Sequence, residues 1–214
     1  MTGRQAMADR IVGIIDDDES VREALGGLFQ SVGLGTECYG SVHAFLAADG
    51  LRRVGCIVLD IRLPGQSGLE FQEALSRSEV AQSVVLISAH VDVQMAVRAM
   101  KCGAVDVLPK PVREQDLLEA VNRALDRDRD RRLAADRNAA LCARYATLTE
   151  RERQVMGLVA AGMLNKQIAD RVNVTEATVK LHRSQVMRKM EADSVPDLVR
   201  MSDRLAEVEK AARI

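Results

Sequence analysis

Side chains that could together transfer a phosphoryl group occur in the first half of the sequence. Asp16 and Asp17 form an acidic pair, Asp60 lies further along, and Ser88 and Lys110 follow. Carboxylates that converge on one point repel each other unless a cation lies between them, and ligand sets made only of oxygen favour Mg²⁺. A carboxylate beside Mg²⁺, a hydroxyl and a lysine can attack a phosphoryl donor, because the cations offset charge on the phosphoryl oxygens. These residue types predict a magnesium-dependent phosphoryl-transfer site, provided that the fold gathers them.

The sequence contains the pattern of a sheet that would bring these side chains together: short apolar runs alternate with amphipathic segments. The runs are mostly rich in Val and Ile, which is typical of strands buried on both faces of a parallel sheet. The alternation predicts a doubly wound, five-stranded parallel α/β sheet. Each candidate residue follows a strand, and ligands in such sheets bind at the carboxyl ends of the strands. We expect strands at 11–15, 34–38, 54–59, 84–87 and 104–108, and helices near 19–31, 41–48, 68–77 and 92–101.

The spacing of these residues is more specific than any one of them. An aspartate after a strand is also ordinary turn chemistry. Asp17 and Asp60, however, are 43 residues apart, Asp60 and Ser88 are 28 apart, and Ser88 and Lys110 are 22 apart. Over about residues 11–124 the chain resembles the flavodoxin-like receiver domain of bacterial response regulators. The segment MAVRAMKCGAVD resembles the FixJ-type branch of that family in particular.

The resemblance implies a magnesium site and a phosphoacceptor. Asp60 would accept the phosphoryl group. Asp16, Asp17 and Asp60 would bind Mg²⁺, with Asp16 bound directly or through water. The backbone carbonyl of Arg62 would complete the protein ligands.

The resemblance also implies how the phosphoryl group is held. Ser88 and Lys110 would contact its oxygens, and the peptide bond between Lys110 and Pro111 would be cis, an uncommon but allowed state before proline. One position departs from the family pattern. Val107 stands three residues before the lysine, where the family usually has Tyr or Phe. An aromatic switch is therefore in doubt, and the signal would travel through the loop that follows Ser88.

The second half of the sequence is helical. A long helix at 113–144 contains the charged run 126–132, which we interpret as a solvated surface segment and linker. Four shorter helices are expected at 150–160, 165–171, 176–190 and 195–209, the first with a capping box at Thr149 and Glu152. We expect three parts: a receiver domain at 1–124, a helical linker at 125–146, and an all-α four-helix domain at 147–214.

One of these helices has the pattern of a DNA-reading helix. Val179, Val186 and Met190 should face the core, and Lys180, Arg183, Ser184 and Met187 should form an outward stripe. A basic outward stripe braced by a shorter helix is the helix-turn-helix geometry for the major groove, although charge alone also fits an ordinary surface helix. The segments LTERE, NKQIA and TVK resemble the LuxR-type DNA-binding domain over about residues 146–205.

The LuxR-type resemblance implies which residues contact DNA. Lys180, Leu181 and Ser184 would face base edges. The phosphate contacts, which position the helix without specifying sequence, would come from Lys166, Thr178, Arg183 and Lys189. Relatives often carry Lys at the position of Ser184, so their operator preference does not transfer.

Composition and charge fit this division. Residues 1–124 carry 12 basic and 17 acidic side chains, a net of −5, whereas residues 165–190 carry 6 and 2, a net of +4. Such asymmetry indicates two domains with different partners. Aromatic residues make up 2% of the chain, which argues against binding single strands by stacking. No apolar run reaches about 18 residues and the first ten residues lack an apolar core, so we expect a cytoplasmic protein with neither membrane span nor secretory signal.

The sequence therefore favours a phosphorylation-controlled transcriptional regulator, with activation the expected effect. A sensor histidine kinase would phosphorylate Asp60, and the chain would then form a homodimer on double-stranded promoter DNA, with RNA polymerase as a further partner. One alternative is a haloacid-dehalogenase-like phosphatase, but such enzymes carry a second aspartate where this chain has Arg62. The other is a phosphorylation-independent DNA-binding protein, which Val107 keeps open.

Overall fold

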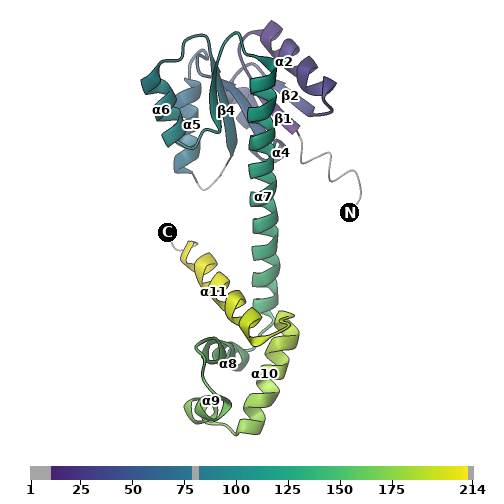
Figure 1. Ribbon diagram of the computed structural model, residues 1–214, viewed down its shortest axis with the longest axis vertical. Helices are drawn as coiled ribbons and strands as arrows, with labels where there is room; N and C mark the ends of the chain where they lie inside the picture. Colours follow the sequence, from purple (N-terminus) through teal and green to yellow (C-terminus); the bar gives the residue numbers. More distant parts are fainter. Residues whose placement is uncertain (1–10, 79–81, 212–214) are drawn as a thin grey trace. The chain divides into compact units, whose positions relative to one another are not determined.

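The computed structural model describes residues 11–78 and 82–211 of the chain (Figure 1). The chain divides into two compact units, Met1–Arg131 and Arg132–Ile214, and the division falls within the long helix α7 (Glu114–Ala146). None of the described helices combines the length and the apolar character needed to cross a bilayer. The first ten residues, where the sequence predicts no secretory signal, lie outside the described ranges.

A parallel five-stranded sheet forms the centre of the first unit. The strand order is β2-β1-β3-β4-β5, as expected for the doubly wound fold. The strands are β1 (Ile11–Ile15), β2 (Gly35–Tyr39), β3 (Cys56–Asp60), β4 (Ser83–Ser88) and β5 (Asp106–Pro109). The helices between them are α2 (Glu19–Ser31), α3 (Val42–Ala47), α4 (Gly50–Arg53), α5 (Gly68–Arg77) and α6 (Val93–Lys101).

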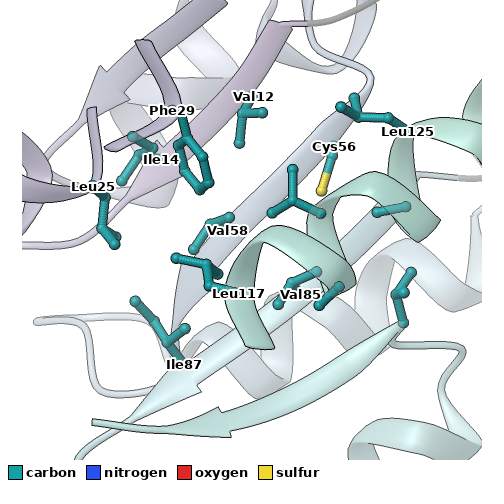
Figure 2. Packing of buried hydrophobic residues seen from close by; sticks show 14 of the residues in the cluster. Val12, Ile14, Leu25, Phe29, Cys56, Val58, Val85, Ile87, Leu117 and Leu125 are labelled. Carbon is teal, nitrogen blue, oxygen red and sulfur yellow. The ribbon is translucent and has the colours of Figure 1, made fainter. Parts of the chain in front are cut away.

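Alternate residues of the central strands point to opposite faces of the sheet and fill two cores. On one face, Cys56 and Val58 of β3 pack with Phe29 of α2 and Leu117 of α7 (Figure 2). On the other face, Ile57 of the same strand belongs to a cluster with residues of α3, α5 and α6. Because both of their faces are buried, the inner strands β1, β3 and β4 are almost wholly apolar rather than alternating.

Helix α4 is the element that the sequence did not indicate. It has four residues, which is too short to show a helical period. Gly50 at its start is buried, and a Cβ at this position would lie 2.2 Å from the ring of Phe45. The close approach of α4 to this ring therefore requires glycine.

Helices also form the second unit, in agreement with the sequence. The C-terminal part of α7 is followed by α8 (Glu150–Ala160), α9 (Asn165–Val172), α10 (Glu176–Met190) and α11 (Val195–Ala211). The predicted capping box at the start of α8 is present: Glu152 N donates to Thr149 Oγ1 at 3.3 Å, and Thr149 N donates to Glu152 Oε2 at 2.7 Å. Asn173, with φ of 52°, makes the left-handed turn between α9 and α10.

The charged run of α7 corrects one expectation. Residues 126–132 were expected to be solvated, but Asp128 is only 1% exposed and forms an ion pair with Arg131. Val121, Ala124 and Leu125 are buried against the sheet, and Asp128 follows them at helical spacing. The helix therefore continues to pack on the first unit through part of the charged run, which alternating charge alone does not reveal.

Candidate functional site

The predicted phosphoryl-transfer residues lie at one edge of the sheet. Asp60 and Ser88 are the last residues of β3 and β4, and Asp16 and Lys110 directly follow β1 and β5. These strands are parallel, so their carboxyl ends share an edge. The backbone N–H of Lys110 donates to the carbonyl of Ser88 at 2.8 Å, which links these two residues directly. The peptide bond between Lys110 and Pro111 is cis, as predicted.

Lys110 bridges two of the carboxylates. Its Nζ donates to Asp16 Oδ2 at 2.6 Å and to Asp60 Oδ2 at 2.5 Å. The side chain of Asp16 is fully buried, and those of Asp60 and Lys110 are 9% and 20% exposed. Burial lowers the pKa of the Lys110 ammonium, but the hydrogen bonds to both carboxylates outweigh it, so that the pKa is raised above its usual value. The lysine is therefore a fixed positive charge beside Asp60.

Hydrogen bonds fix the acidic loop after β1. Asp16 Oδ1 accepts from the backbone N–H of Asp18 at 3.0 Å. Arg22 of α2 donates from Nη1 to the carbonyls of Asp16 and Asp17, at 2.8 and 3.0 Å. Asp18 instead caps α2, because its Oδ1 accepts from the backbone N–H of Ser20 at 2.9 Å. Of the three consecutive aspartates, the first two therefore contribute to the site and the third belongs to the helix.

The three carboxylates fit a divalent cation. Asp16, Asp17 and Asp60 each offer one oxygen, and these oxygens all lie within 4.8 Å of one another. Asp17 is exposed, which leaves the solvent side of the group open. Oxygen-only ligands with room for water suit Mg²⁺, which keeps several waters when it binds to proteins. Burial is the main influence on the pKa of Asp16 and raises it. A cation bound here would act in the opposite direction, because a nearby positive charge favours the ionised carboxylate.

The surroundings of Ser88 and Val107 bear on how phosphorylation at Asp60 would affect the rest of the receiver domain. Ser88 is fully buried; its Oγ donates to the carbonyl of His90 at 3.1 Å and accepts from the His90 N–H at 3.3 Å. Its hydroxyl is thus engaged with the loop that leads to α6. Val107 is half-buried and packs against the cluster between the sheet and α6, so it fills core space.

Two residues that support the site were not identified from the sequence. Arg22 holds the acidic loop through backbone carbonyls, a role that residue type and spacing do not reveal. Gly68 begins α5, and a Cβ there would lie 2.1 Å from the backbone oxygen of Asp60. The sequence marked Gly68 only as a helix start; the contact with Asp60 appears once the loop is folded.

The predicted base-facing residues lie exposed along α10. Lys180, Leu181 and Ser184 are exposed, and Leu181 reaches 57% although it is apolar. Val179 and Val186 on the opposite side are buried, as expected. The outward stripe is narrower than expected, since Met187 is half-buried and packs against the core of the second unit.

The predicted phosphate-contacting residues differ in their surroundings. Lys166 is exposed at the start of α9. Thr178 lies near the start of α10, and Arg183 donates from Nη1 to Asn165 Oδ1 at 2.6 Å. Lys189 donates to Glu152 Oε2 at 2.6 Å and to the carbonyl of Thr147 at 3.2 Å, which links α10 to the capping box of α8.

Comparisons with known proteins identify the family. The model of the response regulator receiver domain matches residues 12–122, and that of the luxR family of bacterial regulatory proteins matches residues 146–202. Nodulation protein W of Bradyrhizobium diazoefficiens is 46% identical over 201 residues, which cover 94% of this chain and 88% of that protein. The chain belongs to the two-component response regulators of the FixJ type. Transcriptional regulatory protein FixJ of Azorhizobium caulinodans is 41% identical, covering 89% of this chain and 90% of that protein.

A solved structure agrees over both units of this response regulator. The response regulator StyR has 41% identity and a TM-score of 0.82, and the match covers 91% of this chain and 98% of that one. The receiver and LuxR-type modules together indicate a transcriptional regulator of a two-component system rather than a turnover enzyme. The findings therefore favour the regulator over the alternative of a haloacid-dehalogenase-like phosphatase.

Proposed function

We propose that a sensor histidine kinase transfers a phosphoryl group to Asp60 of this response regulator. A carboxylate oxygen of Asp60 attacks phosphorus, and the new O–P bond forms as the bond to the kinase imidazole breaks. Mg²⁺ held by Asp16, Asp17, Asp60 and the carbonyl of Arg62 would supply positive charge beside the phosphoryl oxygens. The observation that carries the proposal is the contact of Lys110 with both Asp60 and Asp16 at 2.5 and 2.6 Å.

Lys110 and Ser88 respond to the new group. The ammonium of Lys110 is already beside Asp60 and neutralises part of the added charge, about two negative units. Ser88 exchanges its hydrogen bond with the His90 carbonyl for one to a phosphoryl oxygen. That exchange releases the loop before α6. The loop then transmits the effect of phosphorylation to α6, although position 107 holds a valine and no aromatic side chain.

Helix α6 supplies the surface on which the phosphorylated chain forms a homodimer. Val93, Val97 and Met100 are 79%, 47% and 49% exposed. Their spacing of four and three residues places them on one side of α6. A second copy would cover this apolar stripe. Coupling of about 1–3 kcal/mol between the phosphoryl site and this surface is enough to shift a dimer equilibrium five- to hundredfold.

Dimerisation places two copies of α10 on DNA half-sites about one helical turn apart. Lys180, Leu181 and Ser184 read base edges; Lys166, Thr178, Arg183 and Lys189 contact phosphates. The receiver module spans 1–124, the helical linker 125–146 and the DNA-binding module 147–214. The dimer acts in the cytoplasm as a transcriptional activator, with RNA polymerase as a partner.

The test uses the full-length chain incubated with acetyl phosphate and Mg²⁺. We expect mass spectrometry to show one added phosphoryl group, light scattering to show a dimer, and footprinting to show tighter operator binding. Asp60→Asn should abolish all three, whereas the exposed control Asp126→Asn should behave as wild type. An Asp60→Asn chain that still dimerises and still gains affinity for the operator would refute the proposal. That result would favour a DNA-binding protein that does not depend on phosphorylation.

A further inference from the structure

Helix α6 is attached to α5 near its C-terminal end, and the two helices lie side by side (Figure 1). Gln72 of α5 donates from Nε2 to the carbonyl of Cys102, the C-cap of α6, at 2.8 Å. The next residue, Glu73, accepts a hydrogen bond from Nε of Arg98 and forms an ion pair with it. Ala99, beside Arg98 in the sequence, is fully buried. Two neighbouring residues of α5 therefore fix the last turn of α6.

The N-terminal end of α6 is attached to the phosphoryl-transfer site instead. It follows a loop that begins after Ser88, whose Oγ is hydrogen-bonded to the backbone of His90. Val93, the first residue of the helix, is 79% exposed. Residues 93–97 are all described, and none of them is buried. The two ends of α6 thus differ, because one is fixed to α5 and the other is joined to the loop that phosphorylation would change.

The side-chain amide of Gln72 adds little to the stability of the receiver. Gln72 is 2% exposed, and its Oε1 is buried without a hydrogen-bond partner in the described structure. A buried polar atom that has no partner costs free energy, which offsets the gain from the Nε2 bond. Methionine is unbranched and flexible, so it would fill the same space without this cost. The contribution that remains specific to glutamine is its contact with the carbonyl of Cys102.

The ion pair of Glu73 and Arg98 also acts on position more than on stability. The two side chains are 15% and 57% exposed, and pairs open to solvent contribute little to stability because water screens the charges. The hydrogen bond from Arg98 lowers the pKa of the Glu73 carboxyl, so the carboxylate is ionised at neutral pH. Glu73 also pairs with Arg77 at 3.5 Å, one turn later in α5. That second pair does not involve α6, so Arg77 provides a matched control.

We propose that Gln72 and Glu73 are positioning residues that make α6 pivot about its C-terminal end when Asp60 is phosphorylated. At the rise of an α-helix, Val93 lies about 13 Å along the axis from the C-cap and Met100 about 3 Å. A pivot at the C-cap therefore displaces Val93 much more than Met100. If both contacts with α5 were lost, α6 would adopt several positions whether or not the chain is phosphorylated, and the dimer surface would no longer depend on the phosphoryl group. The inference rests on the proposed function, since it assumes that phosphorylation acts through α6.

The first test compares dimerisation of the full-length chain with and without phosphorylation. Sedimentation experiments give a dimer dissociation constant for each state, and the ratio of the two constants measures the coupling. We expect a ratio of about five or more for the wild type. Gln72→Met and Glu73→Gln should each reduce it to about two or less, while mass spectrometry still shows one phosphoryl group at Asp60. Arg77→Gln, which leaves both contacts with α6 intact, should keep the wild-type ratio.

The second test locates the pivot directly. NMR spectra of the full-length chain are recorded before and after phosphorylation, and the shift changes of the α6 amides are compared along the helix. In the wild type the changes should be largest near Val93 and smallest near Met100. In the Gln72→Met and Glu73→Gln chains this gradient should flatten. A side chain that only supports the fold would not produce such a gradient, so this measurement separates positioning from stability.

Three outcomes would overturn the inference. Wild-type ratios in both α5 variants would show that these contacts do not position α6. Equal amide changes at Val93 and Met100 in the wild type would show that the helix moves as a whole. Lower unfolding midpoints in urea for both variants, with the gradient unchanged, would show that Gln72 and Glu73 only support the fold. Failure of the proposed function is seen separately, because the phosphorylated and unphosphorylated wild type would then have equal dimer dissociation constants.

Discussion

Arg22 holds the carbonyl of Asp16 at 2.8 Å from its Nη1, and the same nitrogen lies 3.0 Å from the carbonyl of Asp17. The guanidinium thus fixes the backbone that presents two of the three carboxylates. It also brings positive charge to a loop that would otherwise be strongly negative.

Arg22→Gln should therefore weaken Mg²⁺ binding. We expect the dissociation constant to rise about tenfold, equivalent to about 1.4 kcal/mol, because the carboxylates lose their fixed spacing. The constant is measured by NMR titration of the loop amides with Mg²⁺. Arg52→Gln, on an exposed arginine of α4, is the control. A loss of thermal stability with unchanged Mg²⁺ affinity would show that Arg22 only supports the fold.

Gly68→Ala and Gly27→Ala should have opposite effects on stability. A Cβ at Gly68 would meet the Asp60 backbone oxygen at 2.1 Å, so the substitution should destabilise the receiver by about 1–3 kcal/mol. At Gly27, within α2, a Cβ would meet nothing within 4 Å, and alanine should stabilise by about 0.5–1 kcal/mol. Urea unfolding measures both changes. Equal effects at the two positions would contradict the close contact.

The ion pair between the buried Glu152 and the half-buried Lys189 should make the second unit sensitive to acid. Burial raises the pKa of Glu152, but hydrogen bonds from Lys189 and Thr149 outweigh it and hold the pKa below its usual value of 4.5. The folded pKa is depressed, so the stabilisation is present above pH 4.5 and is lost as pH falls through the folded value.

Glu152→Gln should remove this acid sensitivity. We expect a loss of about 1.5–3 kcal/mol near neutral pH, because a charged hydrogen bond disappears, and a flatter dependence of stability on pH below 4.5. Hydrogen exchange of α8 and α10 amides reports the stability of this unit. Glu150→Gln, on an exposed neighbour, should leave the pH profile intact. An unchanged pH profile of stability in the Glu152→Gln chain would show that Glu152 does not cause the acid sensitivity.

Val97→Lys should prevent dimerisation without affecting phosphorylation. A lysine in the exposed apolar stripe of α6 would bring two positive charges together in the paired state. Mass spectrometry should show normal phosphorylation at Asp60, while light scattering shows a monomer. Val32→Lys, at a 50% exposed position beyond α2, should still dimerise. Dimers of the Val97→Lys chain would place the interface elsewhere.

Lys166→Ala should weaken DNA binding to all sequences equally. An exposed lysine that contacts a phosphate contributes affinity but no sequence preference, so the slope of log affinity against log salt should fall by about 1. Substitutions at Ser184 should instead change which operator is chosen. Selection from a randomised operator library, read at several salt concentrations, separates the two. A changed sequence preference in the Lys166→Ala chain would contradict the assignment.

Residue patterns alone were enough to predict the fold class, most element boundaries and the candidate residues. Strand β1 and helices α2, α5, α8 and α10 lie at the predicted residues, because periodicity and capping are local properties of the chain. Asp16, Asp60, Ser88 and Lys110 were found because each lies at or directly after the carboxyl end of a strand, and the topology of a parallel sheet brings such positions to one edge.

The contacts that support those residues became visible only in the folded chain. The contact of Arg22 with the acidic loop and the approach of Gly68 to Asp60 each join segments whose separation follows no period. The burial of Asp128 depends on how far α7 packs along the first unit, which the charged run does not reveal. The same holds for Lys189, for which the LuxR-type resemblance implies a phosphate contact, while in the structure its Nζ donates to Glu152 Oε2 at 2.6 Å. Such contacts depend on how folded elements pack, and packing geometry is set by side chains from several elements at once.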